Sequence, residues 1–335
     1  MSLPLNSSTR KQQTGLTIVE MLIAVALSMV LMAGVFQIFI SSKQSYRVQN
    51  ELGRLQENAR FALDVLTRDV RMAGNIGCNQ AASVTNHIGG LLAGISTGIE
   101  GFEQADLVSL GVTPNGVSSA DVAADTDLIL LKSANSVSYN VATAMADGAT
   151  DIELTASPFA ADDAAIVADC KNVDIFQVES VIDGTDLEHG STTLSKPYGT
   201  DAQVMRPYSV VYYIAPDENN NDVRNLYRRV LNSSGTAGLA AEPLIEGVED
   251  MQIEYGENVG GSGLTTRYVK AGTADLDMDN VTAVRIHLLL ATLDKQLASE
   301  PQTYTFNGAS ITSDDRRIFR TMTTTIVLRN AGKSS

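Results

Sequence analysis

Residues 15–40 read GLTIVEMLIAVALSMVLMAGVFQIFI, and this stretch decides how the rest of the chain is organised. A helix over residues 16–40 would rise about 37 Å, enough to cross the hydrocarbon core of a bilayer. Its only charged residue is Glu20, whereas the preceding residues carry Arg10 and Lys11 and no acid. Because basic residues beside a membrane span stay on the cytoplasmic side, we expect one span with a cytoplasmic N-terminus and the remaining chain across the membrane.

Glu20 is the residue that needs an explanation, because a carboxylate inside a spanning helix costs on the order of 3 kcal/mol without a partner. One interpretation is a capping box, since Thr17 and Glu20 have the S/T-x-x-E spacing. Another is a secretory signal peptide, but the apolar run is too long, contains an acid and ends without an A-x-A site. Neither explains a short basic leader that ends in Gly15.

The basic leader, Gly15, the segment Leu-Thr-Ile-Val-Glu and the long apolar run resemble the N-terminal signal of type IV prepilins. The resemblance implies that a prepilin peptidase of the membrane cuts between Gly15 and Leu16 and methylates Leu16. It also implies that Glu20 pairs with the terminal ammonium of a neighbouring subunit in the fibre. The family more often has Phe as its first mature residue and a proline midway along the helix. This chain has neither, so we expect a helix without a proline kink.

The helical pattern continues past the apolar run. In residues 52–70 apolar side chains recur at steps of three and four between charged ones, which predicts an amphipathic helix with one buried face. The pattern stops at Gly74, which favours a left-handed helix cap. We therefore expect one helix from Thr17 to Met72 whose second half packs on the rest of the chain.

Several blocks resemble the PilW family of minor pilins, namely LQENARFAL at 55–63, LIEGVEDMQIEYG at 244–256 and DRRIFR at 315–320. The resemblance implies a type IV pilin fold and a structural role in starting pilus assembly, in a tip complex that supports adhesion and twitching motility. The implied partners are other minor pilins, the major pilin, the prepilin peptidase and the bacterial inner membrane. The chain would lie in that membrane before assembly, and then in the pilus from periplasm to cell surface.

The expected fold class is α+β, a long N-terminal helix packed on an antiparallel β-sheet head. We divide the chain into a leader (1–15), a transmembrane half-helix (16–40), an amphipathic half-helix (41–77) and a β-rich head (78–335). Residues 79–205 resemble no family and are expected to be an insertion. The candidate strands are 127–132, 136–141, 151–155, 165–170, 174–181, 210–214, 226–231, 251–255, 281–290, 303–306 and 320–328.

Charge and cysteine content bound the partners. The 335 residues carry a net charge of −15, which disfavours direct binding to nucleic acid. The two cysteines, Cys78 and Cys170, would lie in the oxidising periplasm. A disulfide between them would close a loop of about 90 residues and stabilise the fold by roughly 4 kcal/mol. The alternative is two buried free thiols.

No catalytic motif is present, and the three histidines have no metal-ligand spacing, so we expect neither enzymatic activity nor a cofactor. One acidic run, Asp217, Asn219, Asn221 and Asp222, offers oxygens that could bind calcium. It lacks the glycine and the distal glutamate of an EF-hand loop, so a polar hairpin tip is the preferred interpretation.

Three other functions stay open at this point. A minor pseudopilin of a type II secretion system shares the signal and the architecture. A tip adhesin would use residues 79–205 to hold a ligand. A membrane-anchored periplasmic enzyme is disfavoured by the absence of a clustered nucleophile or metal set.

Overall fold

The computed structural model describes residue 15 and residues 17–77 and 83–330. The described chain forms two compact units, residues up to Asn50 and residues from Glu51 onward. The helices and 3-10 helices are α1 (Ile18–Met72), η1 (Gly90–Leu92), α2 (Gln104–Ser109), η2 (Pro114–Gly116) and η3 (Met278–Asn280). The strands are β1 (Ser83–Asn86), β2 (Ile99–Glu103), β3 (Asp127–Asn140), β4 (Asp151–Glu153), β5 (Ala164–Ala168), β6 (Asn172–Gln177), β7 (Ser180–Ile182), β8 (Asp186–Glu188), β9 (Gln203–Pro216), β10 (Arg224–Val230), β11 (Glu242–Glu246), β12 (Val248–Glu257), β13 (Arg267–Lys270), β14 (Val281–Ala291), β15 (Thr303–Phe306), β16 (Ala309–Thr312) and β17 (Phe319–Val327).

Helix α1 confirms the predicted continuous helix. The hydroxyl of Thr17 accepts a hydrogen bond from the backbone N–H of Glu20, as the capping interpretation predicted for the helix start. The helix ends before Gly74, which has φ = +73°. Gly98 crosses this end so closely that a Cβ there would lie 2.1 Å from the Gly74 nitrogen, so the crossing requires glycine.

The second half of α1 buries one stripe of small and branched side chains. Leu55, Ala59, Ala62, Leu66 and Val70 follow one another at steps of four, three, four and four residues, and each is at most 3% exposed. They share one hydrophobic core with strands β3, β9, β12 and β14. Since two of the five are alanines, the helix can approach the strands closely. The predicted amphipathic face is confirmed.

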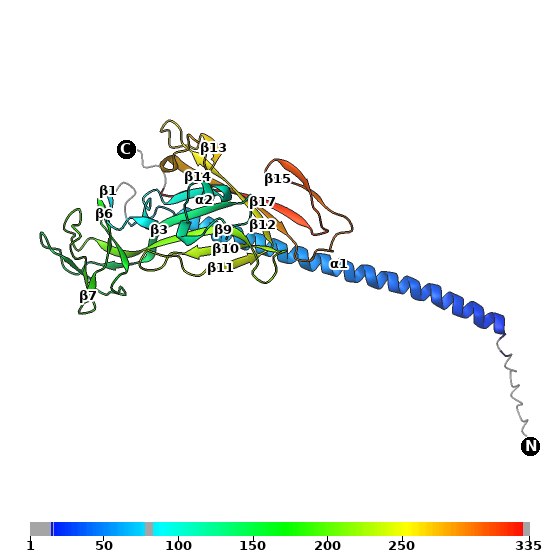
Figure 1. Cartoon of the computed structure of the whole chain (residues 1–335). Helices are drawn as coiled ribbons and strands as arrows, with labels where there is room; N and C mark the ends of the chain where they lie inside the picture. Colours follow the sequence, from blue (N-terminus) through cyan, green and yellow to red (C-terminus); the bar gives the residue numbers. More distant parts are fainter. Residues whose placement is uncertain (1–14, 16, 78–82, 331–335) are drawn as a thin grey trace, which may run out of the picture. The chain divides into compact units, whose positions relative to one another are not determined.

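The largest sheet has eight strands and is organised by β9, which can be followed in Figure 1. One edge of β9 pairs with β3 from Gln203 to Tyr212, and β3 pairs with β2. The other edge pairs first with β5, through Gln203–Met205, and then with β10, through Val210–Pro216. Strands β6 and β1 continue the sheet beyond β5, and β11 continues it beyond β10.

The second sheet runs in the order β13-β12-β14-β17 and is antiparallel throughout. Along β14 the side chains of Val284, Ile286 and Leu288 are fully buried, while Arg285 and His287 between them are partly exposed. The predicted alternation is therefore confirmed. A three-stranded sheet (β4-β8-β7) and a two-stranded hairpin (β15-β16) complete the head. The chain thus has the expected α+β, pilin-like architecture: a long N-terminal helix followed by a region of antiparallel sheets.

Two strands are longer than predicted. The segments 127–132 and 136–141 form the single strand β3, because the polar residues between them make a register irregularity after Ala134 rather than a turn. Strand β9 begins at Gln203, ahead of the predicted 210–214, and contains Pro207. This proline lies where pairing with β5 has ended and pairing with β10 has not begun, so its missing N–H is tolerated.

The segment 79–205 contributes to the head in two ways. Ile99, Ile129 and Leu131 belong to the core that packs on α1. By contrast, twelve residues from Val141 to Val204 form a hydrophobic cluster of their own, under strands β4 to β8. Residues 141–204 are accordingly the part of the segment that carries a separate core.

Candidate functional site

The first half of α1 has the features of a surface that needs a partner from outside the chain. Its large hydrophobic side chains are between 46% exposed, at Val25, and 81% exposed, at Ile18. The helix is long and apolar enough to cross a membrane, and none of its most apolar 18-residue window is buried within the chain. Such a surface is stable only against lipid or against other apolar helices.

Glu20 lies exposed within this apolar surface. Its backbone is capped by Thr17, but among the described residues its carboxylate makes no hydrogen bond and no ion pair. The capping interaction therefore leaves the charge of the side chain uncompensated. A partner would have to come from the leader, the membrane interface or a second protein.

The predicted processing site is only partly described. Gly15 is exposed, and nothing lies within 4 Å of the position that a Cβ would occupy there. Leu16 lies outside the described residues. Cleavage between these two residues and methylation of Leu16 stay predictions.

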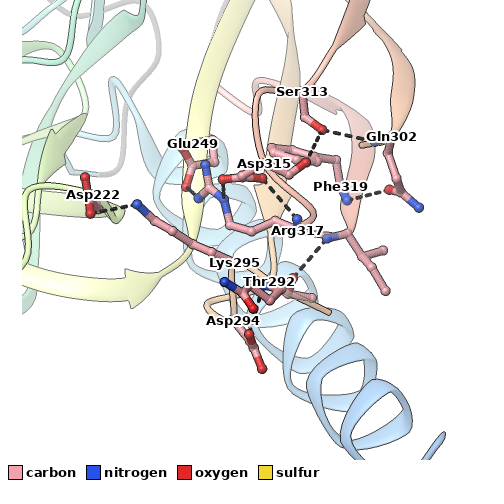
Figure 2. A network of polar contacts seen from close by, with 12 residues as sticks. Asp222, Glu249, Thr292, Asp294, Lys295, Gln302, Ser313, Asp315, Arg317 and Phe319 are labelled. Atoms are coloured by element: carbon pink, nitrogen blue, oxygen red, sulfur yellow. Dashed lines mark hydrogen bonds and ion pairs between the residues drawn. The ribbon is translucent and has the colours of Figure 1, made fainter. Parts of the chain in front are cut away.

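The C-terminal blocks of the sequence meet in a polar network around Arg317 (Figure 2). The Arg317 guanidinium donates to Asp315 Oδ2 at 2.6 Å and to Glu249 Oε1 at 2.5 Å. Burial alone would lower the pKa of Arg317, but the two carboxylates outweigh it and raise the pKa above its ordinary value. Arg317 therefore ties the beginning of β12 to the segment that leads into β17.

Neighbouring contacts in Figure 2 fasten the same segment. The Gln302 side chain accepts from the backbone N–H of Phe319 at 3.0 Å, and Thr292 Oγ1 accepts from that of Ile318 at 3.0 Å. A separate pair, Lys295 with Asp222 at 2.7 Å, ties the segment after β14 to the turn between β9 and β10. Sequence reasoning singled out the blocks but not the pairings, because the partners are 68 and 73 residues apart along the chain.

The weak calcium candidate forms a hairpin tip. Asp217 Oδ1 accepts hydrogen bonds from the backbone of Asn219 and Asn220, and its Oδ2 accepts one from Asn225. Asp222 is paired with Lys295. Asp217 and Asp222 therefore already have protein partners, which supports the interpretation as a polar turn. Calcium binding there stays untested.

The other predicted residues are placed as follows. Cys170 lies in the exposed turn between β5 and β6, but Cys78 lies outside the described residues, so the disulfide stays a prediction. The histidines bind protein atoms: His87 contacts Asp174, His189 contacts the Thr192 carbonyl and His287 contacts Thr323. Within residues 17–77 and 83–330, no three His, Cys, Asp or Glu side chains gather in a way that could hold a metal ion.

Comparison with known protein families assigns the two ends of the chain. Residues 10–36 match the family model of the prokaryotic N-terminal methylation motif. Residues 211–330, from β9 to the end of the described chain, match that of type IV pilus-assembly protein W, PilW. No curated protein and no solved structure gives a significant match.

Together with the fold, the matched N-terminal motif supports the class of type IV pilins, with a prepilin-type apolar helix and a β-rich head. Within that class the match over residues 211–330 supports a PilW-like pilin.

Proposed function

We propose that this chain is a minor pilin that helps to start type IV pilus assembly and sits in a complex at the pilus tip. The resemblance to PilW supports this role. It is carried by the sequence blocks named above and by the matched residues 211–330. The function is structural, without catalysis, and it supports adhesion and twitching motility.

The observation that carries the proposal is the Glu20 carboxylate, which has no partner among the described residues and lies in the exposed, apolar first half of α1. In the proposed sequence of events, a prepilin peptidase removes residues 1–15 and methylates Leu16. The span lies in the inner membrane with its N-terminus in the cytoplasm. On assembly the helix exchanges lipid for the helices of neighbouring pilins, and Glu20 pairs with the terminal ammonium of one of them.

Glu20→Gln tests this step, because it removes the charge and keeps the shape. We expect the variant to reach the membrane at the level of the unchanged chain and to be depleted at least about tenfold from sheared pili. The matched control combines Glu20→Gln with Gln37→Glu. It restores the number of carboxylates in this half of the helix but not the carboxylate at position 20. If Glu20→Gln is incorporated normally, the pairing step is wrong.

A type II secretion pseudopilin shares the signal and the architecture, and the phenotype of a deletion separates the two roles. Loss of surface pili with intact secretion supports the minor pilin. Intact pili with lost secretion would show that the chain serves the secretion system instead.

A tip adhesin is the second candidate, and the separate core of residues 141–204 favours it. Excision of this segment is a poor test, because β5 and β6 also complete the main sheet. A sharper test places a bulky charge on its surface, with Thr193→Arg, and compares Thr321→Arg on β17, which is also exposed and lies outside residues 79–205. Adhesion lost only in the first variant, with normal pili, supports the adhesin; equal adhesion in both argues against it.

A further inference from the structure

An acidic cleft of about 350 Å³ opens in the head where five separate segments meet. The junction of β2 and α2 contributes Glu103, the turn before β3 contributes Asp125, the first residue of β3 is Asp127, and β12 contributes Asp250. The cation in its wall is Lys270 of β13. The hairpin β15-β16 closes the remaining side. We call this space the acidic cleft.

Asp127 is the most buried of these carboxylates, with 4% of its surface exposed. Its Oδ2 accepts a hydrogen bond from the backbone N–H of Ile253 at 2.7 Å. Among the described residues its other oxygen accepts no hydrogen bond. That oxygen is also not one of the fully buried side-chain atoms that lack a partner, so it is not enclosed in the core. Asp127 is one of the residues that line the cleft, and among the described residues this oxygen is its acceptor without a partner.

Lys270 does not neutralise Asp127. Its Nζ donates to the amide oxygen of Gln252 at 2.9 Å, and Asn307 donates to the same oxygen at 3.1 Å. The Gln252 amide nitrogen donates in turn to the Asp125 carbonyl and to the Asp250 carboxylate. In the described part of the chain no ion pair reaches the acidic side chains of the cleft, so the acids outnumber the cation.

Titration of Asp127 reflects this uncompensated charge. Burial raises the pKa of Asp127 to about 7; the Ile253 N–H and Lys270 oppose the rise, while Glu103 and Asp250 add to it. Burial also raises the pKa of Asp250. A carboxyl with a raised pKa is ionised at neutral pH only at the expense of the folded state, and such groups concentrate at binding sites.

The cleft also has apolar lining residues, Phe306, Ala309 and Ile311 of the hairpin and Ala105 of α2. A lining of this kind suits an aliphatic stem, and an aromatic ring adds attraction for a cation. A metal ion suits it poorly, and the described residues offer no set of three metal-ligating side chains.

We propose that the acidic cleft binds an organic cation, an ammonium or guanidinium group on an aliphatic stem, with the free oxygen of Asp127 as its principal acceptor. The cation can be a lysine or arginine side chain of another protein or a free amine. This site does not depend on the pilus assignment, because it rests only on contacts within the head.

The test uses the full-length protein in detergent micelles and two probes, Nα-acetyl-arginine methylamide for a side chain and cadaverine for a free amine. Binding is measured by calorimetry and by the shift in melting temperature at pH 7.5. Asp127→Asn keeps the acceptor for Ile253 and removes the charge. We expect it to weaken binding by about 30-fold or more, whereas Asp151→Asn on β4, the matched control, leaves binding unchanged.

Each outcome decides the proposal. Binding of either probe that depends on Asp127 supports it, and the probe that binds more tightly identifies the source of the cation. Absence of binding by both probes, or equal binding by the two variants, overturns it. Calcium chloride that raises the melting temperature through Asp127 while both probes fail overturns it in favour of a metal site.

A second measurement, the melting temperature at pH 4 and pH 8, checks that Asp127→Asn is folded and tests the electrostatics of the cleft. The folded-state pKa of Asp127 lies above its unfolded value, so its ionisation destabilises the fold as pH rises from about 4 to about 7. The variant should therefore melt at a higher temperature than the unchanged protein at pH 8 and at nearly the same temperature at pH 4. A lower melting temperature at pH 8 would contradict an uncompensated carboxylate.

Discussion

The two halves of α1 share one secondary structure and differ in what surrounds them. Residues 51–72 bury a stripe centred on Leu66 in the core of the head. Residues 18–50 bury no side chain, although they are the more apolar half. The difference teaches that apolar content alone does not place a helix in a protein core. The second half is completed by its own chain, whereas the first half requires partners from outside it.

The largest expected effect on head stability comes from Leu66→Ala. Leu66 is fully buried, so the lost transfer free energy and the cavity together should cost about 2–5 kcal/mol in urea unfolding of the full-length protein in micelles. Leu27→Ala in the first half, where the side chain is 60% exposed, should leave the unfolding of the head unchanged. Equal effects of the two variants would erase the distinction between the halves.

The next effect is expected at Arg317, whose side chain is 12% exposed. Arg317→Met keeps a long stem but leaves Glu249 and Asp315 without their cation, which should cost about 3 kcal/mol by the same measurement. The matched control is Arg54→Met on α1, because Arg54 is 53% exposed and its pairs with Glu51 and Glu246 are long. The control should cost less than about 1 kcal/mol. A loss at Arg317 no greater than at Arg54 would mean that the network does not hold the head together.

A smaller effect is expected at the contact between Tyr212 of β9 and the second half of α1. The Tyr212 hydroxyl donates to Asp69 Oδ2 at 2.7 Å, and burial, with Asp69 beside it, raises the pKa of Tyr212 above its ordinary value. Tyr212→Phe should cost about 1 kcal/mol, the net value of one such hydrogen bond. A neutral substitution would show that the apolar stripe alone attaches the helix.

The smallest effect on head stability, none within error, is expected for Glu20→Gln. Its carboxylate contacts no described residue, so urea unfolding should be unchanged while incorporation into pili falls. A destabilised head would reveal an intramolecular role for Glu20 and contradict the division between the two halves.

The long elements could be predicted from the sequence because their patterns are local. The limits of α1, the stripe from Leu55 to Val70 and the alternation in β14 all follow from side-chain periodicity. Short or polar edge strands such as β1, β2, β11 and β13 were missed, since four or five residues without clean alternation carry too little signal. Residues 133–135 separated two predicted strands that are one strand in the structure, because sequence alone does not reveal a bulge.

The functional residues divide in the same way. Gly15 and Glu20 are visible in the sequence because the prepilin signal is contiguous. The Arg317 network and the acidic cleft are not, since each joins segments far apart along the chain, and their chemistry exists only after the sheets have formed. Asp127 looked like the first residue of an ordinary strand, and only the fold shows that it is buried beside other acids.

The most direct test of the central claim is the mass of the N-terminal peptide of this chain recovered from sheared pili. The account predicts a peptide that begins at Leu16 and carries one added methyl group. Recovery of pilus-associated protein that still begins at Met1 would contradict it.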